Sequence, residues 1–205
     1  KNIGEIILKK TTPLIPTPTN NIIISYLQKW DTLENYVLQE SSLQKLFTKT
    51  YPKNDDIDEI LIKVCSLNDF YSTNIFSPFT VAKHILSLKI DHRLEKRDTQ
   101  LVNDIALVSV KEDKFINFYS FATKYCHQHF QMDYPIYDNY VEKMLLYFKK
   151  RDRFHPFKKS DLKRYPVFKE VILTFRTYYH LTSFDLKDID RYLWLAGKDY
   201  FPRKY

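Results

Sequence analysis

Apolar residues recur every three or four positions along most of this chain, which is the period of an amphipathic helix. Ile23, Leu27 and Trp30 begin this pattern on one helical face. The preceding segment TTPLIPTPTNN has no such period and is rich in Pro and Thr, which predicts an extended N-terminal arm over residues 1–19. Neither an internal repeat nor a change of composition divides the remainder, so we expect one helical domain over residues 20–205.

Helix-start and helix-stop residues place the individual elements. The acids of DDIDEILIKVCSL stand in a first turn, and Pro78 stands at the first position of another helix. The pattern predicts further helices over Thr99–Val108, Lys114–Phe130, Asn139–Lys150, Val167–Tyr179 and Asp185–Ala196, with Gly197 as the last C-cap. Leu107–Phe115 is the one plausible strand pair and is too short to build a sheet. The predicted fold is an all-α, single compact multi-helix domain.

The small-residue counts exclude several classes of protein. The chain has two glycines, so it cannot build the glycine-rich phosphate loop of a P-loop, Rossmann or kinase site. Its two cysteines, Cys65 and Cys126, exclude a disulfide framework and a four-thiolate metal site, and they suit the reducing cytoplasm. No apolar run is long enough for a membrane span. We therefore expect a cytoplasmic protein without a metal, another cofactor or a membrane anchor.

The net charge of +7 is concentrated in one stretch. Residues 141–169 contain ten Lys and Arg against three Asp and Glu, a local excess of 10 − 3 = +7. Such a run is either a solvated face or a surface that binds a polyanion. The residues we expect to contact DNA in the second case are Lys143, Lys149, Lys150, Arg151, Arg153, Lys158, Lys159, Lys163 and Arg164.

Three polar motifs have less specific chemistry. His127 and His129 are two residues apart on a predicted helix and point to different sides, so they do not form a metal-chelating pair. No nucleophile elbow is present, because the glycines it requires are absent. In the turn LNDFYSTNIFSPF, side chains such as Asn68 and Tyr71 either bind a base edge or close the loop on themselves.

The segment YPIYDNYVEKML carries the strongest signal for catalysis. Pro135 sets an extended bend, and a helical apolar stripe follows Asp138. Asn139 with Glu142 makes a capping box, which leaves Asp138 free one residue before the predicted cap. The positive end of the helix favours a negative charge there. An ionised carboxylate at such a place can stabilise a sugar cation and orient an attacking water.

The preceding predicted helix carries Ser120 and Lys124 on one face. Two helices joined by the short loop QMDYP pack as a hairpin, so either side chain can approach Asp138. Lys124 is then either a solvated helix residue or, if desolvated, an amine nucleophile.

Residues Ser120–Leu145 resemble the core of the helix-hairpin-helix DNA glycosylases, and the 8-oxoguanine branch is the most similar. In that family a small-residue helix is followed by a Pro-apolar-Asp turn and a helix that opens with Asp-x-x-Val. By gap-free counting from Asp138, Ser120 falls where bifunctional members have a lysine. The family's glycine-rich hairpin is replaced here by INFYS, which predicts that phosphate binding moves to the basic stretch Lys149–Lys163.

The resemblance implies a monomeric DNA glycosylase that flips a modified base from double-stranded DNA and hydrolyses its N-glycosidic bond, in base-excision repair or anti-phage defence. Asp138 would support bond cleavage, and Ser120 would make water the nucleophile. Asn68 would wedge the duplex, and Tyr71, Phe118, Tyr119 and Tyr137 would bind the flipped base unless they are core residues. Two alternatives remain: a catalytically silent nucleic-acid-binding relative, and a helical protein-interaction module.

Overall fold

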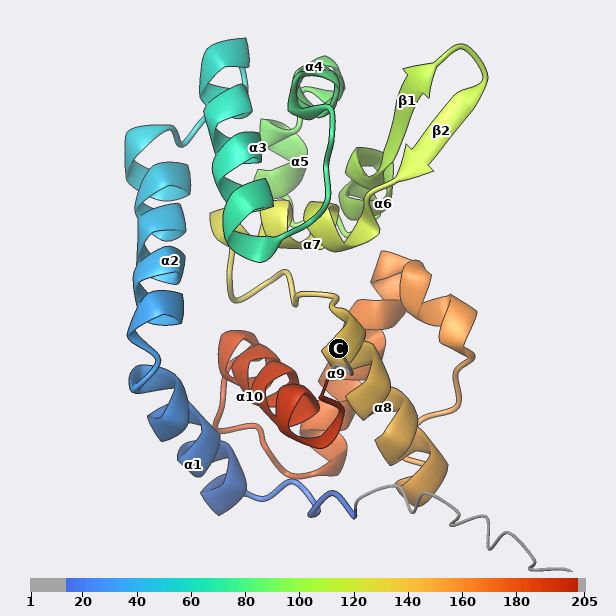
Figure 1. Ribbon diagram of the computed structural model, residues 1–205. Coiled ribbons are helices and arrows are strands. Elements are labelled where there is room, and N and C mark those ends of the chain that lie inside the picture. The colour runs from blue at the N-terminus through green and yellow to red at the C-terminus, as the bar shows by residue number, and fades with distance from the viewer. Residues whose placement is uncertain (1–13, 203–205) are drawn as a thin grey trace, which may run out of the picture.

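The computed structural model describes residues 14–202 and shows a largely helical chain with one small β-hairpin (Figure 1). The elements are α1 (Asn20–Asp31), α2 (Glu34–Lys45), the π-helical η1 (Leu46–Thr50), α3 (Ile57–Tyr71), α4 (Pro78–Leu88), α5 (Asp91–Glu95), α6 (Gln100–Ala106), β1 (Leu107–Lys111), β2 (Lys114–Asn117), α7 (Tyr119–His129), α8 (Asn139–Asp152), the 3₁₀-helical η2 (Lys159–Lys163), α9 (Tyr165–Tyr178) and α10 (Leu186–Tyr200). The predicted helical class is confirmed, and the hairpin begins where the one plausible strand pair, Leu107–Phe115, is predicted.

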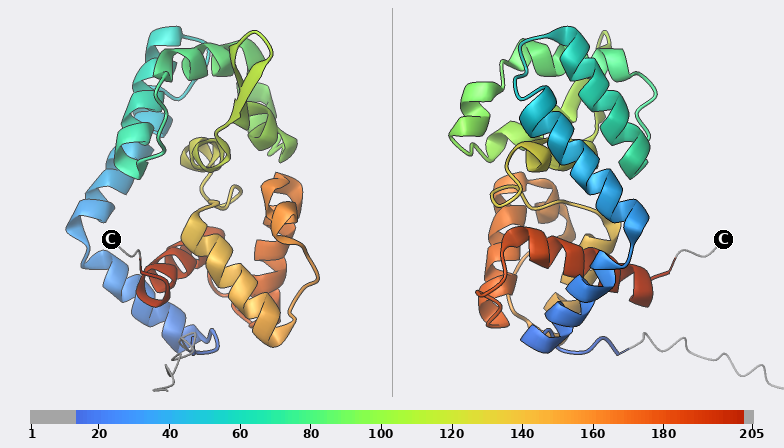
Figure 2. Two further views of the ribbon diagram at one scale, coloured as in Figure 1. Left: turned by 45° about the vertical axis from the view of Figure 1, so that its right-hand side comes forward. Right: turned by 90° about the vertical axis from the view of Figure 1, so that its left-hand side faces the viewer.

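The helices form two groups, one above the other in Figure 1. The upper group contains α3 to α7 and the hairpin, and the lower group contains α1, α8, α9 and α10. Helix α2 runs along one side and contacts α1 below it and α3 and α7 above it. Figure 2 shows the same division from two other directions. The chain passes from α7 in the upper group to α8 in the lower group, so the turn between them lies where the groups meet.

Several predicted helix starts are confirmed, and each has a local physical cause. The carboxylate of Asp56 caps α3 by accepting from the amides of Asp58 and Glu59. Pro78 occupies the first position of α4, where its missing N–H has no cost. Asp185 caps α10 in a reciprocal box with Asp188.

The prediction of a helix over Lys114–Phe130 is wrong at its beginning. Lys114–Asn117 forms β2, which pairs antiparallel with β1, and α7 begins only at Tyr119. Asp113 takes a left-handed φ of 54° in the turn between the strands. Aspartate tolerates that conformation better than most residues, so the hairpin closes without a glycine.

Gly197 is not a C-cap, because α10 continues past it to Tyr200. A Cβ atom at this position would lie 2.6 Å from the Cβ atom of Tyr140 on α8. The glycine therefore permits a close approach between α10 and the first turn of α8. This contact fixes α10 beside the turn that carries Asp138.

The N-terminal arm is extended over its described part, residues 14–19, and residues 1–13 lie outside the described part. Ile15 is fully buried, and its amide donates to the Tyr147 hydroxyl at 3.0 Å. The Arg151 guanidinium donates to the Ile15 carbonyl. The arm thus packs against α8. Within residues 14–202, no helix is long and apolar enough to cross a membrane.

Candidate active site

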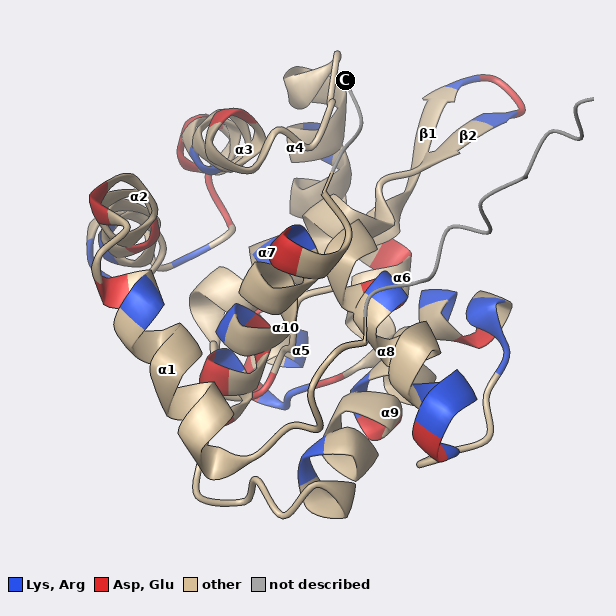
Figure 3. Cartoon of the chain, turned by 60° about the horizontal axis from the view of Figure 1, so that its bottom comes forward, with Lys and Arg blue, Asp and Glu red and all other residues tan. Residues whose placement is uncertain are grey.

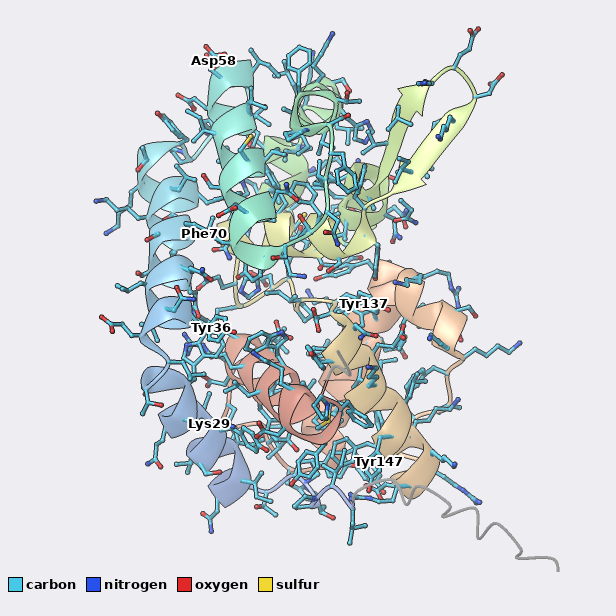
Figure 4. The ribbon with its side chains drawn as sticks, viewed as in Figure 1. Lys29, Tyr36, Asp58, Phe70, Tyr137 and Tyr147 are labelled. Carbon is cyan, nitrogen blue, oxygen red and sulfur yellow. The ribbon has the colours of Figure 1, made fainter. Side chains whose placement is uncertain are left out.

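A cavity of about 320 Å³ lies where the two groups of helices meet. Its wall is formed by α1, α2, α3, α7, α8 and α10, together with the turn before α8. Figure 4 labels Tyr36 and Phe70, which mark the side formed by α2 and α3. Lys124 and Asp138, two of the predicted catalytic residues, both line this cavity.

Asp138 itself is the N-cap of α8, which corrects the prediction that Asn139 caps the helix. Its backbone is extended, and its Oδ1 accepts from the Tyr140 amide at 2.7 Å. Glu142 completes no capping box: it is buried, accepts from the Tyr137 hydroxyl and pairs with Lys159 at 2.9 Å. Capping uses one carboxylate oxygen. The side chain still lines the cavity, so the cap and a catalytic role are compatible in Asp138.

Lys124 is buried rather than solvated, with 4% of its surface exposed. Its Nζ lies 2.6 Å from the Ser120 Oγ and 5.4 Å from the centre of the Tyr71 ring. Burial lowers the pKa of Lys124 to about 8, although Asp138 and Asp190 favour the charged form. Ser120 donates to the Tyr137 carbonyl at 3.1 Å. The structure therefore brings Ser120, Lys124 and the turn at Asp138 together.

A second buried lysine, Lys63, has the hydrogen-bond partners expected of an ammonium with a purely structural role. Lys63 is fully buried, and its three donors reach the carbonyls of Tyr51 and Lys53 and the Asn54 Oδ1 at 2.5 to 3.0 Å. Burial also lowers the pKa of Lys63 to about 8. An ammonium has three donors. Those of Lys63 all have acceptors, whereas Lys124 finds only the Ser120 Oγ among the described residues.

Of the four aromatic residues predicted to bind a base, Tyr71 alone lines the cavity, and its hydroxyl accepts from Gln128 at 3.1 Å. Tyr119 and Tyr137 are buried core residues, packed edge-to-face with ring centres 5.0 Å apart. Phe118 packs against the same core. The structure thus corrects the interpretation of these three, because their rings pack in or against the core and do not line the cavity. Figure 4 shows Tyr137 at the turn into α8.

Further rings that line the cavity come from α1, α2 and α10. Trp30 stacks on Tyr36 with centres 6.1 Å apart, and Trp194 meets both rings edge-on. The Lys198 ammonium lies 4.4 Å from the centre of the Trp194 ring. These residues were not predicted from the sequence, because three segments far apart in the chain supply them.

Charged residues of α10 complete this wall. Arg191 pairs with Glu40 of α2 at 2.8 Å, and Lys187 contacts the same carboxylate. Arg191 also lies over the Trp30 ring, 5.1 Å from its centre. These pairs fix α10 against α2.

The side chain of the predicted wedge residue, Asn68, forms hydrogen bonds within its own loop. Its Oδ1 accepts from the Thr73 hydroxyl at 2.8 Å and the Ile75 amide at 2.9 Å, and its Nδ2 donates to the Ile75 carbonyl. This corrects the interpretation of Asn68 as a wedge, because the amide group is already satisfied locally.

The two histidines of α7 point apart, as their spacing predicts. His127 Nδ1 lies 2.8 Å from the Tyr134 carbonyl oxygen, and burial lowers its pKa to about 4. His129 contacts Asn54 instead, and burial lowers its pKa to about 3. Among residues 14–202, no group of three or more His, Cys, Asp or Glu side chains could hold a metal ion.

The basic stretch divides into paired and open cations. Lys159 and Arg164 pair with acids, Arg151 pairs with Asp152, and Lys149 donates to a carbonyl. Lys143 lies against Tyr140, and Lys163 lies 3.9 Å from the centre of the Tyr137 ring. Lys150, Arg153 and Lys158 are exposed and form no ion pair with any described residue. Figure 3 shows these basic residues at the end of α8 and around η2.

Comparison with known proteins places the chain among uncharacterised relatives. The family model HI_0787_N, described as an N-terminal domain, matches residues 22–134. An uncharacterised protein of Haemophilus influenzae is 48% identical over 149 residues, which cover 72% of this chain and 70% of that protein. No solved structure matches.

Proposed function

We propose that this chain, which belongs to the family of the HI_0787_N N-terminal domain, is a DNA glycosylase that flips a modified base from duplex DNA and cleaves its N-glycosidic bond. One observation carries the proposal. The buried amine of Lys124 and the carboxylate of Asp138 line one cavity, and the turn between α7 and α8 brings them there.

The cavity suits a flipped base in size and lining. Small-molecule sites usually enclose roughly 300–1,000 Å³, and this one encloses about 320 Å³. A flipped base is held by stacking on aromatic rings and by a few polar contacts. Trp30, Tyr36, Tyr71 and Trp194 supply the rings, and Lys124 and Asp138 supply the polar groups.

Asp138 would stabilise the positive charge that develops on the sugar as the base leaves. Two nucleophiles can then complete the reaction. The resemblance at Ser120 implies water, whereas the burial of Lys124 favours its amine. In the second route the Nζ lone pair forms a bond to C1′ as the bond to the base breaks. The base leaves with the electron pair of its own bond to C1′ and takes up a proton. The Nζ then loses a proton, the C1′–O4′ bond breaks, and O4′ takes up a proton as the opened sugar forms a protonated imine with Nζ.

The lysine route predicts a trapped adduct that depends on pH. Since the pKa of Lys124 is about 8, its neutral fraction rises as the pH increases from about 7 to about 9. Borohydride reduction in the presence of a cleavable duplex should yield a protein–DNA adduct whose amount rises over this range. The Lys124→Met variant should yield none. If the wild-type protein yields no adduct but still releases the base, the nucleophile is water.

The proposal itself is tested with a panel of duplexes. The protein is incubated with DNA that contains 8-oxoguanine, uracil, alkylated bases or phage-type modified bases, and the DNA is then treated with hot alkali. Strand breaks at the modified position of at least one duplex are expected. Binding without breaks on every duplex would favour the silent relative, and an absence of both would favour a protein-interaction module.

The exposed cations of the basic stretch favour nucleic-acid binding, both for an active glycosylase and for a catalytically silent relative. Replacing Lys150, Arg153 and Lys158 together by Gln should weaken binding to plain duplex and flatten its salt dependence. The slope of log K against log salt should fall by about 0.9 for each phosphate that the variant no longer neutralises. Replacing the exposed Lys45, Lys49 and Lys96 by Gln removes the same charge elsewhere and is the control. Equal effects of the two triple variants would show that net charge alone matters.

A further inference from the structure

A carboxyl group in the cavity wall has one oxygen without a partner. Asp190 of α10 is 6% exposed, and its Oδ2 accepts from the Ile136 amide at 2.8 Å. Its Oδ1 is buried and has no hydrogen-bond partner among the described residues. Buried polar atoms are normally paired, because an unpaired one loses its hydration without replacement. Asp190 is also one of the residues that line the cavity, so a ligand there is the partner that its free oxygen lacks.

The chemical state of Asp190 follows from its surroundings. Burial raises the pKa of Asp190 well above its usual value, and the negative charge of Asp185 raises it further. The hydrogen bond from the Ile136 amide and the positive charge of Lys124 lower it, but burial has the larger effect. The neutral acid carries one proton. Since Oδ2 accepts from an amide, that proton belongs on Oδ1. In its neutral form Asp190 therefore carries an O–H donor on the oxygen that has no partner among the described residues.

His127 lies beside Asp190 and supplies a hydrogen-bond acceptor. Its Nδ1 is 3.9 Å from the Asp190 Oδ2 and 2.8 Å from the Tyr134 carbonyl oxygen. A carbonyl oxygen only accepts, so Nδ1 carries the proton, and the neutral ring leaves Nε2 as an acceptor. His127 also lines the cavity. Asp190 and His127 are therefore neighbours in the cavity wall, and one supplies a donor while the other supplies an acceptor.

We propose that Asp190 and His127 recognise the lactam edge of a flipped base, meaning a carbonyl group next to a ring N–H. Asp190 donates to the carbonyl oxygen, and His127 accepts from the N–H group. Uracil, hypoxanthine and 8-oxoguanine carry such an edge, whereas adenine does not. This inference rests on the proposed function, since it assigns the cavity to a base.

The protein contains its own reporter for the test. It has two tryptophans, and both Trp30 and Trp194 line the cavity. Quenching of their fluorescence by free uracil, hypoxanthine, 8-oxoguanine and adenine measures base entry in the intact chain. We expect the three lactam bases to bind at least about tenfold more tightly than adenine, because a site built for paired donors and acceptors rejects a base that cannot satisfy them. 1,3-Dimethyluracil, which lacks the N–H group, should bind at least about tenfold more weakly than uracil.

Two substitutions test Asp190 directly. Asp190→Asn keeps a donor at the Oδ1 position and an acceptor for the Ile136 amide, so binding should stay within about threefold of wild type. Asp190→Leu should lose at least about tenfold. Wild-type affinity in Asp190→Leu would overturn the assignment. If that variant does not fold, equal binding of uracil and 1,3-dimethyluracil to the wild-type protein would overturn it instead.

The outcome also separates this inference from the proposed function. Lactam-selective quenching without strand breaks in any duplex would retain the base site and remove the glycosylase. Strand breaks that are unchanged in Asp190→Leu would retain the glycosylase and remove the role of Asp190. An absence of quenching by every base would overturn the assignment of the cavity to a base.

Discussion

Replacing Lys63 by methionine is expected to lower the free energy of unfolding by about 3 kcal/mol, whereas the same replacement at Lys124 should raise it by about 1 kcal/mol. Both lysines are buried, and both replacements keep a long unbranched side chain. Lys63→Met removes the donor to three acceptors and leaves the two backbone carbonyls unsatisfied, whereas the Asn54 Oδ1 keeps its bond from the Tyr125 hydroxyl. Urea unfolding of the two variants beside the wild-type protein measures the difference.

The opposite sign at Lys124 has a physical cause. Its ammonium is desolvated, and the Ser120 hydroxyl is its one acceptor among the described residues. Methionine removes the cost of that desolvation, and Ser120 keeps its bond to the Tyr137 carbonyl. A residue that costs stability where it stands is typical of a functional site. If Lys124→Met proves as destabilising as Lys63→Met, Lys124 has a structural role and the lysine route loses its support.

The approach of Ser120 and Lys124 to Asp138 was predictable from sequence because these residues are close together in the chain. The predicted packing of the two helices as a hairpin is wrong, since α7 and α8 belong to different groups of helices and only the turn between them joins the groups. Ser120 and Lys124 are one turn apart on one helix, and a short loop returns the chain to Asp138. The exact cap was not predictable, since aspartate and asparagine cap almost equally well and stand next to each other. The structure places the cap one residue earlier, at Asp138.

The rest of the site depends on packing between distant segments. Trp30, Tyr36 and Trp194 meet only because α1, α2 and α10 assemble around the α7–α8 turn. The burial of Lys124 is a property of that assembly, and its helical position alone fits a solvated residue equally well. Likewise, the segment Lys114–Asn117 is too short for its hydrophobic pattern to distinguish a strand from a helix. It forms a strand because it pairs with β1.

Replacing Asp138 by asparagine is expected to slow base release by about 10²- to 10³-fold while leaving the fold intact. Asparagine keeps an oxygen for the Tyr140 amide, so α8 retains its cap. The charge that would stabilise the sugar cation is removed. Thermal unfolding should therefore stay close to that of the wild-type protein. Asn139→Ala, one residue away on the exposed first position of α8, is the matched control and should release the base at the wild-type rate.

The most direct measurement is the single-turnover rate of alkali-labile breaks in a duplex that the wild-type protein cleaves, compared between wild type, Asp138→Asn and Asn139→Ala. We predict that breaks accumulate at the same rate in wild type and Asn139→Ala and nearly disappear in a folded Asp138→Asn. Equal rates in all three proteins would contradict the assignment of Asp138 as the catalytic carboxylate.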